Sequence, residues 1–369
     1  MREEAAHGRL TLSTPNFTGN DLNYSEKKFH VAPMLDWTDR HCRVFHRTLS
    51  RSAVLYTEMV TARAVKHGNR DKLLGFSPVE QPVVLQLGGS EPAILAEAAK
   101  IGEDWGYSAI NLNCGCPSDR VQGGNFGACL MAAPALVAEG FAAMRAAVKI
   151  PVTIKCRIGI DDQDEEQALE DFVSALAAAG CRDFIVHARK AWLKGLSPKE
   201  NREIPPLNYG RVQRLKAAWP HLNITLNGGL AALAHDMSHL STLDGVMYGR
   251  EAYHNPWMLT GVDPLFAGAP APVSTRRQAV EALLPYMQDH VAAGLPLHHI
   301  TRHMLGLYHA EAGGRLWRHV LSTDGQRHGA GLEVINHALA VVEEEARRQA
   351  EDRATSRAWK SAQAAATVV

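Results

Sequence analysis

AINLNCGCPSDR, at residues 109–120, is the stretch of sequence that most narrows the choice of fold. Its apolar beginning predicts a buried strand, and the Gly, Cys and Pro that follow end that strand abruptly. Asn113 and Cys116 should therefore lie at the carboxyl end of the strand, where α/β enzymes keep their chemistry. Pro117 favours an extended backbone at Cys116, which lets the thiol project into a cleft.

The two cysteines of this stretch have different interpretations. Unpaired cysteines are usually small buried hydrophobes, and we favour that reading for Cys114. Cys116 lies on a polar loop before the charged pair Asp119 and Arg120, so we interpret it as a functional thiol. The chain has six cysteines with no CxxC pair and no regular spacing, which predicts no disulfide framework and no metal site.

The same unit of short strand, turn and helix recurs along the chain on both sides of this stretch. Strands that alternate with helices imply a parallel sheet, and eight such units predict an α/β fold of the (β/α)8 TIM barrel type, with a doubly wound open sheet as the alternative. The expected strands are roughly Phe29–Met34, Val54–Thr57, Val83–Leu87, Ala109–Leu112, Val152–Lys155, Phe184–His187, Ile224–Leu226 and Gly245–Tyr248. The expected helices include Pro92–Trp105, Pro134–Val148, Glu165–Ala179 and Tyr209–Trp219.

Length and composition indicate a second, smaller domain. The chain has 369 residues, of which 46% are hydrophobic, enough for one large core and a smaller one. After Pro256 the alternation stops, and helical patterns follow at about Arg276–Ala293, Ile300–Tyr308 and Leu332–Gln349. We expect a polar N-terminal extension (1–26), a catalytic barrel (27–265), a C-terminal all-α helical domain (273–350) and a disordered tail (354–369).

The sequence gives no sign of a membrane span or of an export signal. Apolar runs are short and broken by charge, which argues against a membrane span, and the first 26 residues contain no apolar signal core. We therefore expect a cytoplasmic protein without an obligate protein partner.

Polar residues cluster after several of the predicted strands. Alternation places Lys155 and Arg157 on one side of their strand, and His187 and Arg189 on one side of the next. Each pair could be a solvated rim charge, but two cationic pairs beside a thiol loop favour a cofactor or anion site.

Glycine-rich turns follow the last two strands. Asn227, Gly228 and Gly229 end one strand, and Gly249 and Arg250 end the next. Each motif alone could be a tight turn, but together they occupy the loops where many barrels bind a phosphate. They predict a phosphorylated cofactor that extends across the barrel mouth.

A local excess of positive charge favours a nucleic-acid partner. Lys plus Arg equals Asp plus Glu at 39 each, so the net charge does not indicate one. Residues 182–216, however, contain nine Lys or Arg and three acids. The helical region adds Arg276, Arg277, Arg302, His303, Arg315, Arg318 and His319. Such a run can be a solvated face; we expect direct RNA contacts from Lys199, Arg202 and Arg302.

With these residues assembled, the chain resembles the tRNA-dihydrouridine synthases, and most closely their A-type (DusA) subgroup. The resemblance covers about residues 29–337. The matching motifs are APMLDWTDRHCR (32–43), LNCGCPSDR (112–120), IKCRIGID (154–161), HARKAWLKGLSPKENREIPPL (187–207), NGG (227–229) and DGVMYGREAYHNP (244–256). Cys114 is a departure, because the family more often has an aliphatic residue there.

The resemblance implies an FMN-binding barrel, a helical tRNA-binding domain, and NADPH-dependent reduction of a D-loop uridine, at position 20 and often 20a. Cys116 would protonate the uracil ring, and Asn113 would contact the target nucleotide. Apart from the resemblance, the negative charge that develops on the uracil carbonyl needs a fixed cation, which Arg189 could provide. The implied cofactor contacts are Pro33, Met34 and Leu35 along the flavin, Gln86 and Lys155 at its ring, His187, and Asn227, Gly228, Gly229, Gly249 and Arg250 at its phosphate.

Three alternatives stay open. An FMN-dependent reductase of a small pyrimidine or enone would share the phosphate site, but would not need the basic segment. An aldolase could use Lys155 as a Schiff base without flavin. A non-catalytic tRNA-binding protein would use the barrel as a scaffold. Reduction of a ring double bond needs a hydride, which no side chain supplies, so the synthase requires a flavin.

Overall fold

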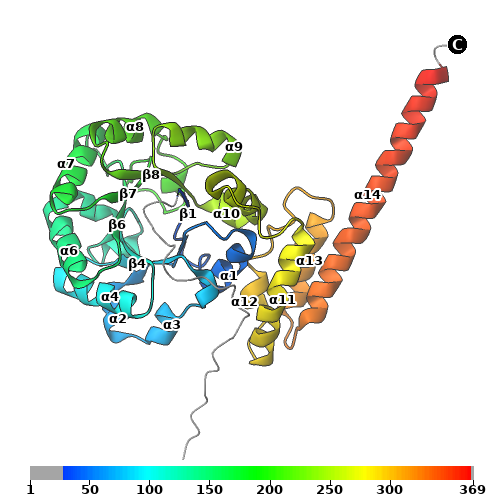
Figure 1. Ribbon diagram of the computed structural model, residues 1–369, viewed down its shortest axis with the longest axis horizontal. Helices are drawn as coiled ribbons and strands as arrows, with labels where there is room; N and C mark the ends of the chain where they lie inside the picture. The colour runs from blue at the N-terminus through cyan, green and yellow to red at the C-terminus, as the bar shows by residue number, and fades with distance from the viewer. Residues whose placement is uncertain (1–27, 367–369) are drawn as a thin grey trace, which may run out of the picture.

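The computed structural model describes residues 28–366, and a closed ring of parallel strands forms its centre (Figure 1). The ring closes where Val31 N donates to Val54 O at 2.9 Å and Val54 N donates to Phe29 O at 3.0 Å. The predicted (β/α)8 barrel is confirmed. The strands are β1 (Phe29–Val31), β2 (Leu55–Tyr56), β3 (Val60–Thr61), β4 (Val83–Gly88), β5 (Ala109–Cys114), β6 (Val152–Arg157), β7 (Asp183–His187), β8 (Asn223–Asn227) and β9 (Gly245–Tyr248).

The order around the ring is β1-β9-β8-β7-β6-β5-β4-β2, and each neighbouring pair is parallel. All eight predicted strands are present within a few residues of their expected bounds. The short strand β3 was not predicted; it extends the edge of β4, with Val60 beside Leu87.

Helices surround the ring (Figure 1). Their apolar side chains share one buried core with those of the strands. The four helices predicted here each end one residue earlier than expected, because the last expected residue is the C-cap. Proline in the first turn favours the start of two of them. The helices are α1 (Arg40–Leu49), α2 (Ala62–His67), α3 (Arg70–Leu74), α4 (Pro92–Asp104), α5 (Asp119–Gln122), α6 (Pro134–Ala147), α7 (Glu165–Ala178), α8 (Tyr209–Ala218), α9 (Leu233–Asp236) and α10 (Arg250–His254).

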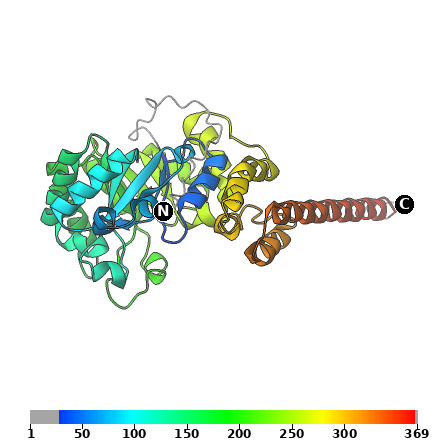
Figure 2. The same ribbon diagram turned by 90° about the horizontal axis from the view of Figure 1, so that it is seen from below.

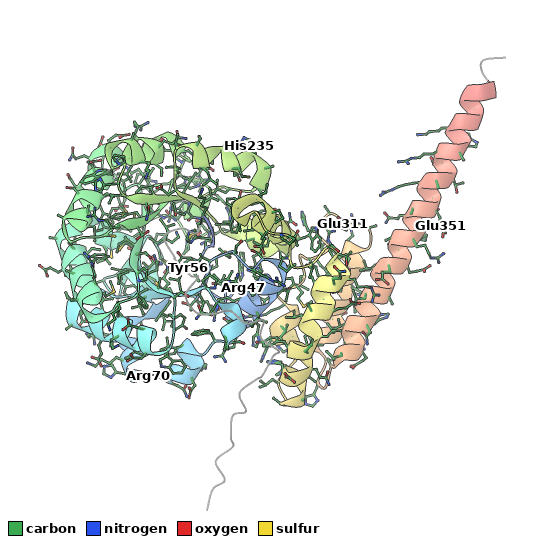
Figure 3. All side chains as sticks on the ribbon, in the orientation of Figure 1. Arg47, Tyr56, Arg70, His235, Glu311 and Glu351 are labelled. Atoms are coloured by element: carbon green, nitrogen blue, oxygen red, sulfur yellow. The ribbon has the colours of Figure 1, made fainter. Side chains whose placement is uncertain are left out.

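A cluster of apolar side chains, here called the apolar plug, fills the barrel interior toward the amino ends of the strands. Its side chains form a cluster separate from the larger core between strands and helices. Tyr56, which lies inside the ring in Figure 3, is fully buried. The plug consists of Ala32, Val54, Tyr56, Val84, Ala109, Ile185 and Met247. Ligands must therefore enter from the carboxyl ends of the strands.

The C-terminal helices gather at one side of the barrel, against α1 (Figure 1). Two features differ from the sequence prediction. The helix expected at 300–308 ends at Thr301, and the following turns bring Gly306 so close to His254 O that a Cβ there would collide. A helix at 314–323 was missed, although it buries Trp317 completely. The helices are α11 (Arg276–Ala292), α12 (His298–Thr301), α13 (Gly314–Thr323) and α14 (Leu332–Ala366).

The expectation of a disordered tail from residue 354 was wrong as far as Ala366, because α14 continues to that residue. Ala, Arg and Glu favour a helix, and Arg347 pairs with Glu344 and Glu351 at helical spacing. The last turns of α14 project from the body of the protein (Figure 2). Glu351 lies on this projecting part, where the side chains point into solvent (Figure 3). The expected extension at 1–26 and the last three residues, 367–369, lie outside the described residues.

Between residues 28 and 366, no helix has both the length and the apolar character needed to cross a lipid bilayer.

Candidate active site

The inward-facing positions just above the apolar plug contain the residues predicted for the site. Because side chains alternate along a strand, the residue two positions after a plug residue also faces inward. Gln86 follows Val84 in this way, and His187 follows Ile185. The strand register sets Asn113 beside Lys155, Arg157 beside His187, and His187 beside Asn227.

A ladder of buried amides joins three strands beneath the cysteine loop. Gln86 Nε2 donates to Asn111 Oδ1 at 2.8 Å, and Asn111 Nδ2 donates to Thr153 Oγ1 at 2.9 Å. Asn113 Nδ2 donates to Gln86 Oε1 at 2.9 Å. The ladder fixes the orientation of Asn113 from below.

Asn113 in turn holds the cysteine loop. Its Oδ1 accepts hydrogen bonds from Gly115 N at 3.1 Å and from Cys116 N at 3.0 Å. The Cys116 thiol is half-buried and lies 3.5 Å from Ser118 Oγ. Cys114 is completely buried, and burial raises the pKa of its thiol, as expected for a core residue. The structure thus presents Cys116, and not Cys114, at the mouth.

Arg157 ties two loops together through three hydrogen bonds. Its Nε donates to Gly115 O at 2.9 Å, and its Nη1 donates to Lys190 O and to Asn201 O, each at 2.9 Å. The guanidinium is buried, and burial lowers its pKa to about 10, while the charge of Cys116 acts in the opposite direction. Arg157 therefore links the cysteine loop to the loop after β7.

Lys155 and His187 face the mouth with unused hydrogen-bonding capacity. No residue in the described range bonds Lys155 Nζ or the His187 ring. Burial, and then Arg157, lower the pKa of Lys155 to about 8. The same two causes, with Lys155, hold the pKa of His187 well below its usual range, so this ring is neutral at pH 7. Such groups suit a ligand rich in carbonyl or anionic oxygens.

The glycines after β8 have two roles. Gly228 and Gly229 have positive φ angles of 108° and 70°. A Cβ would lie 2.5 Å from His187 Cδ2 at the first and 2.5 Å from Leu207 Cδ1 at the second, so packing alone requires glycine. No described residue accepts a hydrogen bond from the backbone N–H of either glycine. These free donors could hold a phosphate.

Two arginines near these glycines have other partners in the structure. Arg250 Nη1 lies 2.6 Å from Glu203 Oε1, in a pair that is 40% and 45% exposed. Such exposed pairs are weak, so a phosphate could displace Glu203. Arg189 Nη1 donates to Pro205 O, while its Nε is buried without a partner within the described chain. Gly249 is the N-cap of α10, and Asn227 Nδ2 donates to Met247 O at 2.8 Å.

The segment after β1 forms another part of the rim. Met34 Sδ lies 3.8 Å from the Cβ position of Gly249, which places Pro33 and Met34 beside the last strand. Leu35 is 65% exposed. Sequence reasoning missed Trp37, whose ring stacks on Tyr253 at a centroid distance of 4.5 Å.

The basic segment is less available to RNA than its composition suggested. Five of its nine cations bind protein oxygens: Arg189, Lys190, Arg211, Arg214 and Lys216. Four exposed cations have no partner among the described residues: Arg182, Lys194, Lys199 and Arg202. Arg182 precedes β7 and so lies at the amino ends of the strands, opposite the mouth. The remaining three lie in the loop that Arg157 anchors.

Arg302 lies away from these groups, at the joint between barrel and helices. Its Nη2 binds Asp39 Oδ2 at 2.5 Å, and Asp39 also binds His303. The Arg302 side chain is 45% exposed, so an RNA contact through its free edge stays a prediction.

Comparison with known proteins identifies the family. The family model described as dihydrouridine synthase (Dus) matches residues 30–345. This chain belongs to the dihydrouridine synthase family.

Among curated dihydrouridine synthases, the tRNA-dihydrouridine(20/20a) synthase of Xanthomonas campestris pv. campestris is 53% identical, with 92% of this chain and 99% of the relative covered. The enzyme of that name from Shewanella oneidensis is 54% identical, with 88% and 96% covered. The one from Vibrio cholerae is 55% identical, with 85% and 96% covered. The similarity to the A-type subgroup noted in the sequence is thus confirmed.

Dihydrouridine synthases are flavin-dependent oxidoreductases, and the residues at this mouth fit a flavin phosphate ester. The free N–H groups of Gly228 and Gly229 suit its phosphate, and the unpartnered Lys155 and His187 suit its ring carbonyls. Sequence reasoning assigned Asn111 no role, and it assigned Arg157 a role in a cofactor or anion site but not as the link between two loops. Asn111 is a polar residue on the inward face of an apolar strand, and Arg157 lies two positions after Lys155; inward periodicity was the available signal.

Proposed function

We propose that this chain is a tRNA-dihydrouridine synthase that reduces uridines 20 and 20a of the tRNA D-loop, with FMN as cofactor and NADPH as reductant. Family membership supports the reaction, and the names of the relatives support the target nucleotides. The observation that carries the proposal is the half-buried Cys116 thiol, anchored by Asn113 beside the unpartnered Lys155.

The reaction adds a hydride to one carbon of the uracil double bond and a proton to its neighbour. FMN supplies the hydride when it is bound at the mouth. Cys116 Sγ donates the proton as a general acid. The thiolate that remains is stabilised by Lys155 and Arg157, two buried cations whose pKa the charge of Cys116 raises.

The substrate must leave its stack to reach this thiol. A base within a folded RNA has to be flipped outward before chemistry on its ring. Lys194, Lys199 and Arg202 lie on the loop next to the mouth and are exposed, so they can bind phosphates around the flipped nucleotide. Lys155 and His187 then face the uracil and flavin carbonyls.

The test is anaerobic. The purified protein is loaded with FMN and reduced with NADPH, and flavin reoxidation is followed after unmodified tRNA is added, with nucleoside analysis of the product. We expect reoxidation with dihydrouridine at positions 20 and 20a. Cys116→Ala should lower the rate by about 10²- to 10⁴-fold. Cys129→Ala, which alters another half-buried thiol, should leave it unchanged.

Other outcomes would contradict the proposal. Full turnover by Cys116→Ala would remove the acid role. A yellow protein that reduces free pyrimidines and ignores tRNA would be a small-molecule reductase, and a chain that takes up no FMN would exclude flavin chemistry.

A further inference from the structure

Three histidines from distant parts of the chain meet where the barrel joins the helical region. His41 lies in the first turn of α1, His290 in the last turn of α11, and His299 in α12. One ring nitrogen of each lies within 4.8 Å of the others. The ring centroids of His41 and His290 are 4.8 Å apart, and those of His290 and His299 are 5.7 Å apart.

Each of the three rings has at least one nitrogen without a hydrogen bond to a described residue. His290 Nε2 lies 3.1 Å from Pro296 O, which can only accept, so Nε2 bears the proton and Nδ1 is a free base. His41 Nδ1 lies 2.7 Å from Tyr286 Oη, which leaves Nε2 for another partner. The His299 ring has no hydrogen bond within the described residues. Metal-binding histidines are usually oriented by such outer contacts.

The three imidazole rings of the cluster are also held in their neutral form. Burial is the largest cause of the lowered pKa at all three rings, and it takes that of His41 to about 3. Asp39 favours a positive charge on His41 but does not outweigh burial, His290 and His303. Neutral imidazoles are the form that binds a metal.

We propose that His41, His290 and His299 form a binding site for a divalent transition metal, with Zn²⁺ the best match, and with water as the fourth ligand. Zn²⁺ prefers imidazole nitrogen, with Zn–N distances of about 2.0–2.1 Å in a tetrahedron. Nitrogens on such an ion are about 3.3 Å apart, so closing the cluster requires shifts of about 1–1.5 Å. The site does not depend on the flavin or on the proposed reaction.

A metal at this place would lock the two parts of the molecule together. α1 belongs to the barrel, whereas α11 and α12 belong to the helical region, and α1 packs against both. The sequence showed no metal-ligand spacing because the ligands lie 249 and 9 residues apart. Folding alone brings them together.

The test measures metal binding by the full chain. Metal-free protein, prepared with a chelator, is titrated with Zn²⁺ and separately with Co²⁺, whose visible spectrum reports ligand type and geometry. We expect one ion per chain, a tetrahedral Co²⁺ spectrum without a thiolate charge-transfer band, and a melting temperature raised by about 3–5 °C at 100 times Kd. EDTA should reverse the rise.

Variants distinguish this site from adventitious binding of metal to surface histidines. His299→Ala removes a ligand, so its affinity for Zn²⁺ should fall by more than about 100-fold. Removal of a contact that only orients a ligand costs about 10- to 100-fold. Tyr286→Phe, which removes that contact from His41, should weaken binding by about 10- to 100-fold. His309→Ala is the control, because this exposed histidine of the helical region is not part of the cluster, and the variant should bind Zn²⁺ normally. Unchanged binding in His299→Ala, a thiolate spectrum, or no binding by the wild-type chain would each overturn the proposal.

Discussion

Asn113 holds the thiol loop with a side chain that is itself held by Gln86. Asn113→Ala removes all three hydrogen bonds, so we expect unfolding to become easier by about 1–3 kcal/mol. The thiol should lose its fixed position, and turnover of tRNA should fall by about 10²-fold. Urea denaturation and single-turnover reoxidation measure the two effects.

Asn113→Asp is the informative companion variant. It keeps the acceptor for Gly115 N and Cys116 N but loses the donor to Gln86. It should therefore retain more activity than Asn113→Ala. Equal losses in both variants would show that the loop is not held through this acceptor.

Lys155 should make the stability of the flavin-free protein depend on pH. Burial and Arg157 lower its folded-state pKa to about 8, below the ordinary value of about 10.4. Between these values the unfolded chain binds more protons, so the free energy of unfolding due to this group rises with pH. Urea denaturation from about pH 7 to 10 measures the free energy of unfolding of wild type and of Lys155→Met. The value for wild type should rise relative to that of the variant as the pH increases. A flat difference would contradict the assignment.

At the scale of elements, Asp39 joins α1 to the helical region. It caps α1 through His41 N at 2.9 Å and Cys42 N at 3.0 Å, and it binds Arg302 and His303. Burial alone would raise its pKa, but His303, the Cys42 N–H and Arg302 together hold that pKa well below its usual range.

Asp39→Asn should lower the free energy of unfolding by about 2–4 kcal/mol at pH 7. Because the folded-state pKa is depressed, this contribution is present above about pH 3.9 and is lost as the pH falls toward the folded value. The difference in free energy of unfolding between wild type and Asp39→Asn should therefore become smaller as the pH falls. Thermal unfolding between pH 2 and 7 measures it, and a gap independent of pH would contradict the ion-pair origin.

The sequence predicted elements well where periodicity and end signals agreed. Gly245–Tyr248 was predicted at its observed bounds, and Pro92–Trp105 missed by one residue because Trp105 is a C-cap. The helix at 314–323 was missed, because it begins at two glycines and is amphipathic over only ten residues. The Ala-rich end of the chain was expected to be disordered, whereas alanine favours the helix that continues to Ala366.

At the scale of the whole molecule, the free cations define where RNA should bind. Lys199 and Arg202 are exposed and have no partner among the described residues beside the mouth, whereas Arg182 is exposed at the opposite end of the barrel. The double variant Lys199→Ala/Arg202→Ala should bind tRNA more weakly and reduce the salt slope by about 1.4–1.8. Arg182→Ala should change neither. Filter binding at several salt concentrations tests this; an effect of Arg182→Ala as large as that of the pair would place the RNA elsewhere.

The end of α14 contributes little to stability. From residue 351 to 360 its side chains are exposed, and the helix projects from the body (Figure 2). Removal of residues 351–369 should therefore leave the free energy of unfolding within about 0.5 kcal/mol of wild type. A larger loss in chemical denaturation would indicate that this segment packs against the protein.

Most of the candidate site was predictable, because inward periodicity and strand ends are visible in the sequence. Cys116, Lys155 and His187 were placed correctly relative to the strands. Side-chain partners were not predictable. Composition could not show that Arg250 binds Glu203, since that contact depends on how a loop folds back over the barrel.

The guanidinium of Arg157 bonds at once to the loop that bears the thiol and to the loop that bears the free cations. Because Arg157 connects the two loops, an RNA that binds poorly to the loop after β7 would also displace Cys116, the proposed proton donor. Fidelity would then need no separate checking step, because a poorly fitting RNA would be bound and released without being reduced.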